Sequence, residues 1–148
     1  MNENGFCGKI KYEINEDEVR FMKREARVKA MQLLYSIDVL GITYEEALVE
    51  EEDLDVLAGD YAKYCYQHLQ QIDDIITHSL KNYTIDRLNL VDKAIIRLAV
   101  SEMLEGSQPK EVIINEALEI TKEYSDQGDH KAVSFNNRLL DNIKNALQ

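Results

Sequence analysis

Apolar residues recur at intervals of three and four along most of the chain from residue 20 to residue 147, and this spacing constrains the fold most strongly. Such spacing places one apolar stripe along an α-helix, and that stripe can be buried in a core. The 148-residue chain contains one proline and six glycines, so few positions interrupt a helix. These features predict an all-α bundle of six or seven helices and argue against a loop-rich β-sandwich.

Capping and helix-breaking residues predict where the helices begin and end. Asn15 with Glu18, and Thr43 with Glu46, have the spacing of a capping box, and Gly41 can end a helix in the left-handed conformation. The helices are expected at about residues 16–40, 44–51, 53–83, 90–105, 109–125 and 130–147. The third is either one long helix or two helices with a bend near residues 70–73.

The chain is expected to form one domain preceded by a short extension. Residues 1–16 contain two glycines and mixed polarity, which predicts a flexible N-terminal extension. Residues 17–148 are long enough for a single helical domain with its own core, which needs neither a disulfide nor a metal ion for stability.

A cluster of basic residues stands out against the formal net charge of −11. Residues 20–29 contain one acid, Glu25, and five bases: Arg20, Lys23, Arg24, Arg27 and Lys29. Four of these bases recur at helical spacing and therefore share a stripe. The stripe is either a phosphate-binding face or a solvated face that balances the acidic remainder, which includes eight acids and no base between residues 41 and 62.

The sequence contains no recognisable catalytic or cofactor-binding motif. His68, His78 and His130 lack a second ligand at metal-site spacing, and no glycine-rich phosphate loop is present. We therefore expect no metal, no cofactor and no enzymatic activity. Cys7 and Cys65 form no disulfide framework, which fits a reduced cytoplasmic setting. No apolar run is long enough to predict a membrane span.

Three stretches resemble, in order and spacing, the NusB family of transcription antitermination factors. The first runs from Ala26 to Tyr35, with Arg27, Ala30, Gln32 and Leu34 between them, the second contains VDKAIIRLA at residues 91–99, and the third contains INEALEI at residues 114–120. Together they cover about residues 20–147, so the resemblance extends over the whole predicted domain.

The resemblance implies a NusB-like fold of two packed helical subdomains and a role in transcription of ribosomal RNA operons. Family members bind the single-stranded boxA element of nascent RNA together with a small-subunit ribosomal protein, NusE. This pair joins an antitermination complex on RNA polymerase. Homodimers also occur in the family, and no membrane partner is implied.

The resemblance also assigns roles to individual residues. RNA contacts fall on the basic residues Lys23, Arg24 and Arg27 and on the aromatic residues Tyr35, Tyr83 and Tyr124. Basic side chains contact phosphates, and tyrosines stack on unpaired bases, although packing in a helical core explains a half-buried tyrosine equally well. Asp92 falls where the family meets its ribosomal-protein partner, and acidic residues 45–60 are expected to lie away from RNA.

The last helix departs from the family pattern. Asn136 and Arg138 stand where the family has a hydrophobic residue and a glycine, and the preceding loop, residues 125–133, is longer. An alternative is therefore a divergent NusB-like protein-interaction module without specific RNA binding. A similar helical domain precedes some ribosomal RNA cytosine methyltransferases, but the sequence contains no cofactor loop or catalytic domain of that kind, so we do not expect this activity.

Overall fold

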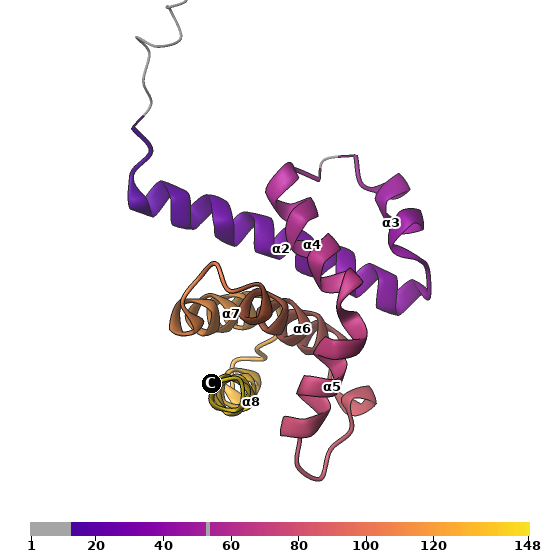
Figure 1. Ribbon diagram of the computed structural model, residues 1–148, viewed down its shortest axis with the longest axis vertical. Helices are drawn as coiled ribbons and strands as arrows, with labels where there is room; N and C mark the ends of the chain where they lie inside the picture. Colours follow the sequence, from indigo (N-terminus) through magenta and orange to yellow (C-terminus); the bar gives the residue numbers. More distant parts are fainter. Residues whose placement is uncertain (1–12, 53) are drawn as a thin grey trace, which may run out of the picture.

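The computed structural model describes residues 13–52 and 54–148, and within that part of the chain it contains seven α-helices and no strand (Figure 1). The helices are α2 (Glu16–Leu40), α3 (Tyr44–Glu50), α4 (Val56–Gln67), α5 (Leu69–Ser79), α6 (Leu90–Glu105), α7 (Lys110–Tyr124) and α8 (Lys131–Ala146), with a 3-10 turn, η1 (Ile85–Arg87), before α6. The predicted all-α bundle is confirmed. Residues 1–12 of the predicted extension lie outside the described residues, and residue 16 already belongs to α2.

The predicted capping residues hold the helix ends. At the start of α2, Asn15 accepts a hydrogen bond of 2.8 Å from the Glu18 backbone N–H. Gly41 ends the helix with φ +63°, a conformation that strains residues with a Cβ atom. Thr43 and Glu46 form both hydrogen bonds of the capping box that begins α3.

The long third helical region is two helices that meet at His68, slightly before the predicted bend. His68 has φ −112° and ψ 20°, outside the helical range, and its ring Nδ1 lies 2.8 Å from the Tyr64 carbonyl oxygen. The second of the two helices, α5, ends at Ser79, four residues before the predicted end.

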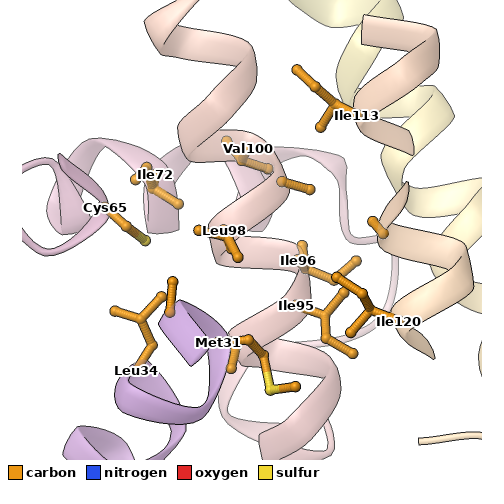
Figure 2. Close-up of a cluster of buried hydrophobic side chains, with 14 of the residues drawn as sticks. Met31, Leu34, Cys65, Ile72, Ile95, Ile96, Leu98, Val100, Ile113 and Ile120 are labelled. Carbon is orange, nitrogen blue, oxygen red and sulfur yellow. The ribbon is translucent and has the colours of Figure 1, made fainter. Parts of the chain in front are cut away.

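Helix α6 is the central element of the core. It packs against α2, α4, α5, α7 and α8, and its residues from Asp92 to Met103 are buried with the exception of half-buried Arg97. Figure 2 shows its side chains between residues of the surrounding helices: Met31, Leu34, Cys65, Ile72, Ile113 and Ile120. Helices α2 and α4 pack against each other and against α6, and α7 and α8 likewise pack against each other and against α6 (Figure 1).

The first two turns of α2 contribute little to this core. The apolar spacing places Met22 on the stripe expected to enter the core, but its side chain is 54% exposed and its neighbour Phe21 is 65% exposed, so this expectation is wrong. In Figure 1 this end of α2 extends beyond α4, so few elements cover it. None of the helices in the described ranges is long and apolar enough to cross a membrane.

Candidate nucleic-acid interface

Only part of the basic stripe of α2 is turned toward α6 and α7, because Arg27 is buried there whereas Arg20 is 63% exposed. Arg27 is 3% exposed and donates two hydrogen bonds to Glu102 of α6, of 2.7 and 2.8 Å. Its guanidinium also lies 5.4 Å from the ring centroid of Tyr61. Arg27 is therefore buried and its charge is compensated inside the protein, and its predicted contact with RNA stays a prediction.

Arg24 lies one turn nearer the N-terminus and reaches the surface. Its side chain is 35% exposed, and it donates hydrogen bonds of 2.8 and 2.9 Å to Glu116 of α7, which is 7% exposed. Arg27 Nη1 is 3.8 Å from the same carboxylate. Four alternating charges, Glu102, Arg27, Glu116 and Arg24, thus connect α6, α2 and α7.

The electrostatic effect of this network is clearest at Glu116. Hydrogen bonding from Arg24 lowers the pKa of the Glu116 carboxyl, and the positive charges of Arg24 and Arg27 act in the same direction. The carboxylates of Glu116, Glu119 and Glu123 in turn help to raise the pKa of Arg24. The surface around Arg24 is therefore more acidic than the basic stripe alone suggests.

Lys23 is the other predicted phosphate contact, and it is half-buried at the edge of two clefts. One cleft of about 350 Å³ includes Asp60 and Tyr61 of α4, and the other, of about 300 Å³, includes Val112 and Glu116 of α7. Within the described part of the chain, Lys23 has no ion-pair partner within 4.0 Å. Both clefts also contain acidic side chains, Asp60 in the first and Glu116 in the second.

The three predicted tyrosines occupy different environments. Tyr124 is 42% exposed at the end of α7, whereas Tyr35 is half-buried against the core. Tyr83 is 40% exposed and packs against Phe135 of α8, with ring centroids 5.8 Å apart. The Arg87 guanidinium lies 5.3 Å from the Tyr83 centroid, so this group combines two aromatic rings and a cation. The sequence analysis did not identify Phe135 as part of this group, because its contact with Tyr83 depends on how α8 packs.

Asp92 is directed into the junction of α6, α7 and α8. It is 9% exposed and accepts hydrogen bonds from Ser125 Oγ at 2.5 Å and from Asn136 Nδ2 at 3.1 Å. Asn136 is fully buried and also bonds to Thr121 Oγ1 at 3.1 Å. This polar network accounts for asparagine at a position where a hydrophobic residue was expected, and it leaves Asp92 little surface for a direct partner contact.

The acidic segment, residues 45–60, lies mainly in α3 and the beginning of α4. Lys29 of α2 pairs with Asp55 at 3.6 Å, so part of the acidic charge is compensated there. The segment is not completely separated from the basic residues, because Asp60 lines the same cleft as Lys23.

The described residues contain no cluster of three or more His, Cys, Asp or Glu side chains that could hold a metal ion. Burial raises the pKa of the Cys65 thiol to about 12, so this cysteine is an inert core residue. The fold and the surface features define an all-α protein in which charged pairs connect the helices and aromatic and basic groups lie at the surface.

Comparison with known proteins places this helical protein in a family. The profile of the NusB family matches residues 24–145. The transcription antitermination protein NusB of Bacillus subtilis (strain 168) is 38% identical over 130 residues, which cover 85% of this chain and 97% of that protein. The corresponding protein of Bacillus cereus (strain ATCC 10987 / NRS 248) is 36% identical over 131 residues, covering 84% and 98%. The chain belongs to the NusB family.

Solved structures agree with this assignment. T. maritima NusB is 31% identical, with a TM-score of 0.72 over 83% of this chain and 90% of that chain. A crystal structure of the antitermination factors NusB and NusE in complex with dsRNA gives a TM-score of 0.73 at 29% identity, covering 86% and 98%. The helical fold therefore matches that of the family over most of both chains.

Proposed function

We propose that this protein is a non-enzymatic transcription antitermination factor that binds boxA-type single-stranded RNA of ribosomal RNA operons together with NusE. The protein and NusE, bound to this RNA, would then join an antitermination complex on RNA polymerase, in the cytoplasm. The observation that carries the proposal is the similarity to the NusB chain of a complex with NusE and dsRNA, at a TM-score of 0.73. The Bacillus relatives are named transcription antitermination proteins, which supports the antitermination part of this role.

The surface supplies groups suited to RNA. Half-buried Lys23 and half-exposed Arg24 are the proposed phosphate contacts, because arginine and lysine give RNA binding its salt dependence. Tyr83 and Tyr124 are 40 and 42% exposed and are the proposed stacking groups, whereas Tyr35 has less free surface. We assign Arg27 a supporting role inside the protein. We assign Asp92 the role of fixing the α7–α8 loop so that the loop can contact NusE.

The alternative is a NusB-like interaction module that lacks specific RNA binding. The ion pairs of Arg24 and Arg27 favour it, because two of the predicted RNA-binding cations are already compensated by glutamates. The formal net charge of −11 also opposes binding of a polyanion. A homodimer that forms through the same surface would also leave the protein without specific RNA binding.

Fluorescence anisotropy tests the proposal against this alternative. The probe is a short labelled boxA-like single-stranded RNA, with a scrambled RNA and a double-stranded RNA as controls, measured at two salt concentrations with and without NusE. We expect tighter binding to the boxA-like strand, strengthened by NusE. Equal affinities for the boxA-like and scrambled strands would support the interaction module instead.

A further inference from the structure

Glu116 is a buried carboxylate that contacts both arginines expected to bind RNA. It is 7% exposed, accepts hydrogen bonds of 2.8 and 2.9 Å from Arg24 Nε and Nη2, and lies 3.8 Å from Arg27 Nη1. The Arg24 side chain is 35% exposed. The pair therefore joins an inaccessible acceptor to a cation that reaches the surface.

The hydrogen bonds to Glu116 leave part of the Arg24 guanidinium unused. A guanidinium carries five N–H donors in a planar fork, and Glu116 accepts from Nε and Nη2. Among the described residues, no acceptor bonds to Arg24 Nη1. The remaining N–H groups of Nη1 and Nη2 share one edge of the plane, which is the geometry that binds a phosphate through two hydrogen bonds.

We infer that Glu116 is a positioning residue that holds Arg24 with this free edge toward an RNA phosphate, an inference that rests on the proposed function. A free arginine loses rotamer freedom when it binds, whereas Glu116 has already fixed Arg24 in the protein without RNA. Arg27, on the inner side of Glu116, helps to compensate the buried carboxylate. Arg27 thus contributes to the site without touching RNA.

The opposite role for Glu116 would be that of a competitor. In that case its carboxylate, with those of Glu119 and Glu123 nearby, would oppose the RNA phosphate for Arg24. The two roles predict opposite effects when the negative charge of Glu116 is removed. Loss of a positioning group weakens RNA binding, whereas loss of a competing anion tightens it.

The test is fluorescence anisotropy with a boxA-like single-stranded RNA in the presence of NusE, comparing wild type with Glu116→Gln and Glu119→Gln. Glu119 is the matched control, because it is exposed, lies on the same helix and hydrogen-bonds to Lys122 rather than to Arg24. Glu116→Gln should weaken binding about tenfold, the scale of one well-placed hydrogen bond. Glu119→Gln should leave binding unchanged or tighter.

Arg24→Lys provides a second test that perturbs the core less than a change at Glu116. Lysine keeps the positive charge but lacks the planar fork needed to bind a glutamate and a phosphate together. Arg24→Lys should weaken RNA binding in the wild-type background and add no further loss in the Glu116→Gln background. A purely structural role for Glu116 does not predict this coupling, and thermal melts of each variant report the folded fraction separately.

The inference is overturned if Glu116→Gln binds RNA as tightly as wild type or more tightly. It is also overturned if the effects of the Glu116 and Arg24 changes on binding simply add. Absence of RNA binding by the folded wild-type protein with NusE is a different outcome, because it overturns the proposed function itself.

Discussion

Arg27 and Glu102 form a buried ion pair whose residues are 3 and 5% exposed. Each charge was removed from water to form the core, and their mutual hydrogen bonds offset that cost. If one partner is truncated, the other remains as a poorly compensated charge between α2 and α6. The role of these two residues is therefore to hold α2 and α6 together in the folded protein.

Arg27→Ala should therefore lower the free energy of unfolding by about 3–5 kcal/mol, the range for breaking a buried pair from one side. Urea unfolding followed by circular dichroism measures this change. Arg20→Ala is the matched control, because Arg20 is 63% exposed in its ion pair with Asp17, and such surface pairs contribute about 0–1 kcal/mol. Equal effects of the two substitutions would contradict the burial of Arg27.

The ion pair between Glu116 and Arg24 should make the stability of the fold depend on pH. Its pKa is lowered from 4.5 in the folded protein, first by the hydrogen bond from Arg24, so folding is favoured by its ionised form. This contribution is fully present above the unfolded pKa and is lost as the pH falls through the folded pKa. We predict that Arg24→Ala loses less stability than wild type when the pH falls from about 5 to about 3. Urea unfolding at each pH measures this loss. The same pH dependence in both proteins would contradict the stabilisation of ionised Glu116 by Arg24.

Helix α2 shows at the scale of elements what the sequence could predict and what it could not. Its ends followed from Asn15 and Gly41, because capping chemistry is local. Its periodicity also grouped the basic residues on one stripe. The direction of that stripe depends on Glu102 and Glu116, which are 75 and 92 residues away from Arg27 and Arg24, and no pattern within α2 contains that information.

Alanine substitutions at two glycines should change the stability in opposite directions, because the backbone conformations at the two positions differ. Gly41→Ala places a side chain at φ +63° and should destabilise the protein by about 1–2 kcal/mol, although no atom lies within 4 Å of the added Cβ. Gly59→Ala, inside α4, meets Leu54 at an ordinary 3.7 Å and should stabilise by about 0.4–1 kcal/mol. Thermal melts compare them, and changes of the same sign would contradict the assigned conformations.

Across the whole molecule, the all-α fold and the family assignment could be predicted because they depend on repeated spacing and on three separated motifs. The candidate site was less predictable. Tyr83 and Phe135 meet through the packing of the segment before α6 against α8, and Asp92 meets Asn136 from a helix 44 residues away. Such contacts depend on tertiary packing, so the sequence named several participants without showing which of them remain accessible.

The ratio of affinities for boxA-like and scrambled single-stranded RNA, measured with NusE present at one fixed salt concentration, tests the central claim most directly. The fixed salt concentration matters because counterion release changes the affinity of every RNA complex. We predict that the boxA-like strand binds at least about tenfold more tightly, a free-energy difference of about 1.4 kcal/mol. A ratio of one, with NusE still bound to the protein, would contradict specific RNA recognition and leave a NusB-family protein-interaction module.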